Sequence, residues 1–139
     1  MIGGWFRDWR LRRRTESLDP AAELSRLRAA LNETPAVRGL RWRRIRAVGP
    51  VAWALAAEDD LTALQQVEVE FEPSDDEAGE EMADAPGLRS VRVGTVVIRS
   101  EGLGWAVDTP VQMNLTPADL VARTPDELRP WTPGSRSKP

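Results

Sequence analysis

Three residue types that carry much of enzyme chemistry are missing from this chain. Its 139 residues include no Cys, no His and no Tyr, and the single Lys is Lys138, next to the last residue. Without Cys there is no disulfide, thiol nucleophile or thiolate ligand. Without His there is no Ser-His or Cys-His catalysis, and the usual zinc sites are excluded. The sequence therefore predicts a protein that is not an enzyme and that binds no metal and no cofactor.

Long apolar stretches are also lacking. No segment approaches the roughly 18 consecutive apolar residues of a transmembrane helix, and the N-terminus has no apolar run of the kind found in secretion signals. We therefore expect a soluble, cytoplasmic protein. Arg outnumbers Lys by 18 to 1, and Ala, Gly and Pro are common, which is typical of GC-rich coding and favours a prokaryotic source.

The length and the composition fit one domain with polar extensions. A chain of 139 residues has the usual size of a single domain, and one core of this size needs no disulfide or metal. We divide the chain into a basic, aromatic N-terminal segment (1–16), a single α+β domain (17–129) and a disordered, Pro-rich tail (130–139).

Charge is unevenly distributed although the net charge is only −3. Residues 1–46 carry a net charge of +7, residues 47–88 carry −12 with no basic residue, and residues 89–139 carry +2. Such asymmetry can indicate a nucleic-acid or membrane contact by the basic end. The alternative, which we favour, is that basic and acidic strands lie next to each other in one sheet and neutralise each other.

Two helices are indicated by their caps and their apolar spacing. Asp19 is a good N-cap, Pro20 suits the first helical position, and Asn32 and Pro35 end the helix. Within it, Leu24, Leu27 and Leu31 form one apolar stripe. A short second helix starts at Thr116-Pro117 and ends near Arg123, followed by one more turn at 124–127.

Strands are indicated wherever the apolar period changes to two. The predicted strands span 40–48, 51–57, 65–72, 88–100 and 103–108, with a short one at 111–115. Gly49-Pro50 is a turn signal, 58–64 is a connection, and Gly94 marks a bulge because the apolar positions change phase there. The acidic stretch 73–87 is a loop or a short helix. The fold class is therefore α+β, a curved antiparallel sheet of about five to six strands with one N-terminal helix packed on a face and a short C-terminal helix.

The N-terminal segment is the most suggestive candidate site. On a helix, Trp5, Phe6 and Trp9 share one face with Ile2. Trp and Arg are the residues most enriched at binding hot spots, so we predict a partner-binding surface made of Trp5, Phe6, Arg7, Trp9, Arg10, Arg12, Arg13 and Arg14. A protein partner is preferred. Binding to an anionic membrane surface through residues 1–16 and packing of the Trp residues on the domain itself remain alternatives, and nucleic acid is disfavoured.

A second basic cluster, in the strand at 40–48, has a simpler explanation. Basic residues interleaved with an aromatic can bind nucleic acid by phosphate contacts and stacking, and this cluster consists of Arg38, Arg41, Trp42, Arg43, Arg44 and Arg46. The sequence pI of about 5.1 is opposite to the basic character of such domains. We expect these arginines to face Glu68, Glu70 and Glu72 instead.

Two further functions deserve comparison with docking. A curved sheet lined by Trp42, Trp53 and Trp105 would offer a pocket for a small apolar ligand, although Trp on an inward strand face is usually core. A hydrolase could use a pair of carboxylates among Asp59, Asp60 and Asp108, but their spacing does not distinguish them from turn residues. The acidic stretch 75–84 does not match the calcium-loop pattern, so we expect a solvated loop there.

Overall fold

The computed structural model describes residues 2–133, and the burial of side chains from residue 5 onward. Its helices are α1 (Ile2–Thr15), α2 (Pro20–Glu33), α3 (Glu77–Met82) and α4 (Pro117–Arg123), with one 3₁₀ turn, η1 (Ala57–Asp59). Its strands are β1 (Leu40–Ala47), β2 (Ala52–Leu55), β3 (Leu61–Pro73), β4 (Arg92–Glu101), β5 (Gly104–Val107), β6 (Gln112–Met113) and β7 (Arg129–Trp131).

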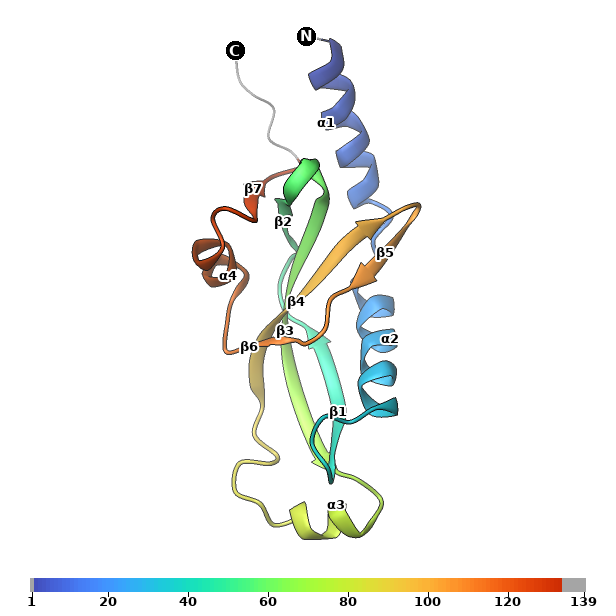
Figure 1. The fold of residues 1–139 in the computed structure, drawn as a ribbon, viewed down its shortest axis with the longest axis vertical. Helices are drawn as coiled ribbons and strands as arrows, with labels where there is room; N and C mark the ends of the chain where they lie inside the picture. Colours follow the sequence, from blue (N-terminus) through green and yellow to red (C-terminus); the bar gives the residue numbers. More distant parts are fainter. Residues whose placement is uncertain (1, 134–139) are drawn as a thin grey trace.

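All seven strands belong to one open antiparallel sheet, which confirms the predicted α+β class with one strand more than expected. The strand order is β5-β4-β3-β2-β7, with β1 also on β3 and β6 also on β4. The molecule is elongated, and α1 and α3 lie at its opposite ends (Figure 1).

The long strand β3 organises the sheet, and its start was predicted wrongly. Residues 61–64, which were expected in a connection, are the first four residues of β3 and pair with β2. The reversal between β2 and β3 takes place in η1, where Glu58 and Asp59 have φ of 61° and 58°. Two successive left-handed residues form the tight turn whose twist suits a hairpin. A turn made of Glu and Asp has none of the Asn-Gly signal by which such hairpins are recognised.

The chain does not reverse direction at Gly49-Pro50, although this dipeptide is typical of a turn. Ala47 lies opposite Val67 and Ala52 lies opposite Leu64, so β1 and β2 run in the same direction along one edge of β3. The four residues between them bulge outward, with Gly49 at φ 72°. The side-chain amide of Gln65 lies beneath this bulge and donates hydrogen bonds to the carbonyls of Val48 and Gly49.

The bulge predicted at Gly94 is wrong as well. The β3–β4 register runs without a shift from Thr62–Arg99 to Val69–Arg92. Gly94 is small for a different reason, because a Cβ there would lie 3.1 Å from the carbonyl oxygen of Gln112 in β6. The shift in register occurs in β1, between Trp42 and Arg44, which explains the imperfect alternation of that strand.

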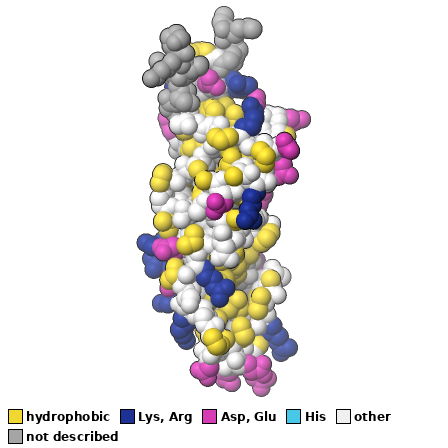
Figure 2. All heavy atoms as spheres, turned by 90° about the vertical axis from the view of Figure 1, so that its left-hand side faces the viewer, with side chains coloured by type: hydrophobic (Ala, Val, Ile, Leu, Met, Phe, Trp, Pro, Cys, Tyr) yellow, Lys and Arg dark blue, Asp and Glu magenta, His cyan; other side chains and the backbone are white. Residues whose placement is uncertain are grey.

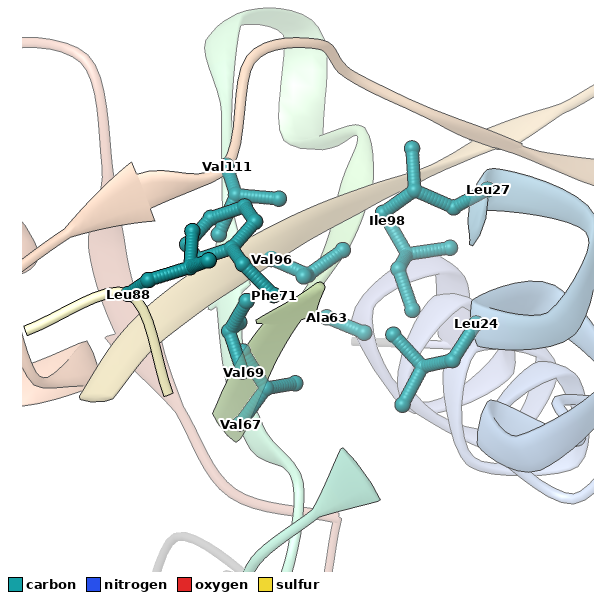
Figure 3. Close-up of a cluster of buried hydrophobic side chains, with 10 residues drawn as sticks. All are labelled: Leu24, Leu27, Ala63, Val67, Val69, Phe71, Leu88, Val96, Ile98 and Val111. Atoms are coloured by element: carbon teal, nitrogen blue, oxygen red, sulfur yellow. The ribbon is translucent and has the colours of Figure 1, made fainter. Parts of the chain in front are cut away.

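The main core lies between α2 and one face of the sheet (Figure 3). As predicted, Leu24 and Leu27 of α2 point onto the strands, and the Asp19 carboxylate accepts a hydrogen bond from the Ala22 amide at the start of the helix. The inward positions of β3 and β4 complete the cluster with Ala63, Val67, Val69, Phe71, Val96 and Ile98, joined by Leu88 and Val111 from the connections.

A second, smaller core covers part of the opposite face. Leu120 of α4 and Leu128 pack on Ala54, Leu64 and Val97. The helix begins in a capping box in which Thr116 and Asp119 exchange hydrogen bonds. The Thr116 N–H that donates to the Asp119 carboxylate lowers the pKa of Asp119. α4 confirms the short C-terminal helix expected from Thr116-Pro117.

The first two residues of the predicted tail lie in a strand. Pro130 and Trp131 belong to β7, which pairs with β2 and places Trp131 opposite Trp53. A short edge strand tolerates Pro130 because its missing N–H is not needed by a further strand. Residues 134–139 of the predicted tail lie outside the described residues.

The free edge of β1 is closed by a side chain. Asn32, at the end of α2, accepts a hydrogen bond from the Trp42 amide at 2.8 Å and donates one to the Trp42 carbonyl at 2.9 Å. The side-chain amide of Asn32 therefore pairs with the backbone of Trp42 in β1 as a neighbouring strand would. Such protection of an exposed edge limits pairing with other chains.

We expect Asn32→Ala to lower the free energy of unfolding by about 2 kcal/mol, because each of the two hydrogen bonds contributes about 1 kcal/mol. Urea denaturation followed by Trp fluorescence measures the change. Glu33→Ala is the matched control, since Glu33 is the exposed neighbour of Asn32 in α2. Equal stability of the two variants would show that the Asn32 contacts with Trp42 contribute nothing.

Candidate protein-docking surface

The N-terminal segment forms a helix whose aromatic side chains face solvent. Trp5, Phe6 and Trp9 of α1 are 64%, 48% and 42% exposed, and we call these three residues the aromatic face. None of them contributes to either core cluster. The alternative that these residues pack on the domain's own sheet is therefore wrong.

The orientation of α1 follows from which residues contact the body. Leu11 and Thr15 are half-buried, and Leu11 lies about 160° around the helix from Trp9 at 100° per residue. The side of α1 that carries Leu11 is thus turned toward the domain, and the aromatic face is turned outward.

Within the aromatic face the rings and two arginines contact one another. The ring centroids of Phe6 and Trp9 lie 5.8 Å apart. The guanidinium of Arg10 lies 5.5 Å from the Phe6 centroid, and that of Arg13 lies 5.7 Å from the Trp9 centroid. These cation–π contacts hold both positive charges beside the exposed rings.

Two other arginines anchor α1 to the domain. Arg7 forms an ion pair of 2.6 Å with Asp59 in the β2–β3 turn, and Asp59 also pairs with Arg129 of β7. The Arg14 guanidinium donates hydrogen bonds to the carbonyls of Gly102, Leu103 and Gly104 in the β4–β5 hairpin.

The hairpin contact is reinforced by an aromatic ring. The Arg14 guanidinium lies 4.9 Å from the Trp105 centroid, and the Trp105 indole donates to the Ser17 hydroxyl at 3.1 Å. The eight predicted docking residues thus divide into three groups. Arg7 and Arg14 hold the helix, Arg12 is half-buried, and the aromatic face with Arg10 and Arg13 is exposed to solvent.

The three tryptophans proposed as a pocket lining do not lie together. The Trp53 and Trp105 rings contact each other at 5.8 Å between centroids, whereas Trp42 contacts Phe71 at 4.6 Å. All three are partly buried and pack against the main core. Their packing accounts for their inward positions and gives the ligand-pocket hypothesis no support.

The second basic cluster faces acidic side chains, as expected. Arg41 pairs with Glu72, Arg43 and Arg44 pair with Glu70, and Arg46 pairs with Glu68. The register of β1 on β3 places each of these acids opposite or next to its arginine. The basic strand is therefore neutralised within the sheet, which removes the main argument for a nucleic-acid contact there.

Two of the three candidate catalytic carboxylates form ion pairs, and Asp60 forms none with a described residue. Asp59 is held by Arg7 and Arg129, and Asp108 is held by the Arg99 Nε at 2.6 Å. Over residues 2–133, no group of three or more His, Cys, Asp or Glu side chains is arranged to hold a metal ion.

Sequence reasoning missed the contacts that attach α1. The Arg7–Asp59 and Arg14–Gly102 contacts join residues 52 and 88 positions apart, and no local pattern marks such pairs. The sequence at 58–64 predicted only a connection, with no sign that Asp59 binds α1.

Comparison with known proteins identifies no relative. No protein-family model, no curated protein and no solved structure matches this chain. Among the described helices, none has the length and apolar character needed to cross a membrane.

Proposed function

We propose that this protein is a non-enzymatic accessory or interaction protein that docks onto a protein partner through the aromatic face of α1. The observation that carries the proposal is the exposure of Trp5, Phe6 and Trp9 on a helix whose other side is anchored by Arg7 and Arg14. Burial of three such side chains contributes strongly to binding, and single aromatic anchors often account for 2 kcal/mol or more in interfaces. A cytoplasmic location and a prokaryotic source stay predictions from the sequence.

A protein partner suits the composition of this face better than a lipid surface does. Arg13 stacks on Trp9 within the aromatic face. Insertion of this face into acyl chains would therefore also place the charged Arg13 guanidinium in an apolar layer. Interleaved Trp and Arg suit an acidic protein surface that has apolar hollows, where both parts of the face find partners. The partner surface is therefore expected to be acidic and partly apolar.

The test is affinity capture from native lysate with the full-length chain and its triple variant Trp5→Ala, Phe6→Ala, Trp9→Ala. We expect a stoichiometric partner with the natural chain and at least a tenfold lower recovery with the variant, because each lost anchor weakens binding about tenfold or more. Quantitative mass spectrometry measures the recovery.

The matched control is Leu103→Ala. Leu103 is 98% exposed, so shortening its side chain takes away apolar surface outside the aromatic face and leaves the core intact. The Leu103 carbonyl that accepts from Arg14 is kept. The control should keep the partner. Equal recovery by all three proteins would contradict docking through α1, and sedimentation of the natural chain, but not the triple variant, with phosphatidylglycerol vesicles would assign the face to a membrane instead.

A further inference from the structure

The helices at the two ends of the molecule carry opposite charge. At one end, α1 exposes Arg10 and Arg13 beside its aromatic face. At the other end, acidic side chains gather around α3, as the lower part of Figure 2 shows. The segment 74–84, which contains α3, holds six acids and no basic residue.

Acids of α3 and of the turn that follows it are exposed together. Glu77, Glu80 and Glu81 follow the i, i+3, i+4 spacing of a helix face, and Asp84 is exposed in the turn after α3. We call these four residues the acidic stripe. The buried side of the helix is made by Ala78 and Gly79. The start of the helix is fixed by Asp76, whose carboxylate accepts hydrogen bonds from the Ser74 hydroxyl and the Gly79 amide, and these bonds lower its pKa.

The acidic stripe differs from the acids of β3 in having no cationic partner. Glu68, Glu70 and Glu72 are paired with the arginines of β1, and Asp75 lies 3.7 Å from Arg41. Within residues 2–133, no Arg lies within ion-pair distance of a carboxylate of the acidic stripe. Four like charges on neighbouring turns repel one another, and acids near the C-terminal end of a helix oppose its dipole.

The geometry prevents the two ends from meeting within one chain. α1 and α3 lie at opposite ends of the elongated molecule with the sheet between them (Figure 1). The cationic, aromatic surface and the unpaired acidic stripe can therefore contact each other only between two copies.

We propose that the aromatic face of α1 in one copy docks on the acidic stripe of a second copy, so that the chain associates head to tail. The proposal rests on the docking role of α1 proposed above and names a second copy as its partner. Arg10 and Arg13 would face the unpaired carboxylates. The aromatic rings would lie over the shallow, open hollows beside α3, one next to Leu88 and one next to Pro73, both of which Arg89 also lines.

A contact of this kind uses two different surfaces of each copy, so every dimer retains one free aromatic face and one free acidic stripe. Such heterologous contacts build rings or open chains rather than closed symmetric dimers. Because the contact joins opposite charges, it weakens as salt rises.

Sedimentation velocity of three full-length proteins tests the proposal. One variant carries Arg10→Ala and Arg13→Ala, and the other carries Glu80→Arg and Glu81→Arg; all four positions are exposed, so the fold should persist in both. The neutral α1 of the first variant gains no attraction to the basic stripe of the second. The natural chain should form dimers and larger species as its concentration rises at low salt. Each variant alone should stay monomeric, since each lacks one of the two surfaces.

The decisive sample is the equimolar mixture of the two variants. The mixture contains one natural α1 and one natural acidic stripe, so it should form a 1:1 dimer and nothing larger. A natural chain that stays monomeric throughout would overturn the proposal, and so would self-association of the Glu80→Arg, Glu81→Arg variant, which would indicate contact between two α1 helices. Either result leaves the capture experiment above free to identify a different protein partner.

Discussion

Replacing Ile98 by alanine is expected to lower the free energy of unfolding by about 4 kcal/mol. Ile98 is fully buried in the middle of β4 and belongs to the main core beneath α2 (Figure 3). Its strand neighbours Ala63 and Val107 hold it on both sides, so the structure cannot collapse into the cavity left by the lost methyl and methylene groups. Urea denaturation monitored by circular dichroism measures the loss.

Leu103→Ala is the matched control for that measurement. Both substitutions shorten an aliphatic side chain to alanine, but Leu103 is 98% exposed at the tip of the β4–β5 hairpin. Its stability should stay within about 0.5 kcal/mol of the natural chain. If Ile98→Ala unfolds at the same urea concentration as Leu103→Ala, the core is not packed as described.

Gly79→Ala is expected to destabilise the acidic end by about 3 kcal/mol. A Cβ on Gly79 would lie 1.7 Å from the backbone carbonyl oxygen of Ser74, and neither backbone segment can move without breaking the cap that Asp76 places on α3. Hydrogen exchange should show loss of protection in residues 74–84 first, because the clash lies there.

The control for this substitution is Gly104→Ala, in β5. The closest atom to a Cβ at that position is the Glu101 carbonyl oxygen at 3.9 Å, an ordinary contact. This variant should keep the stability of the natural chain and its exchange pattern in residues 74–84. Unchanged protection in Gly79→Ala would mean that α3 does not pack on Ser74 as closely as the structure has it.

The sequence by itself determined the fold class and most of the elements. The caps at Asp19 and Thr116 specify α2 and α4 because they satisfy backbone groups within a few residues. The alternation at Val67, Val69 and Phe71 specifies the buried side of β3 because the side-chain period of a strand is two. The charge blocks likewise predicted the pairing of the arginines of β1 with the glutamates of β3.

The tertiary structure decided the features that depend on distant partners. The same turn signals are compatible with a reversal or with a bulge, so only the pairing of β1 and β2 with one edge of β3 showed that Gly49 lies in a bulge. The apolar positions around Gly94 change phase, but this local pattern could not reveal that a glycine is needed there to leave room for β6.

The same reason applies to the N-terminal segment. The periodicity placed Trp5, Phe6 and Trp9 on one face of a helix but could not say whether that face turns inward or outward. The direction depends on where Arg7 and Arg14 find acceptors, at Asp59 and in the hairpin, more than 50 residues away along the chain. Only the fold brings those acceptors to one side of α1, and their position leaves the aromatic face exposed.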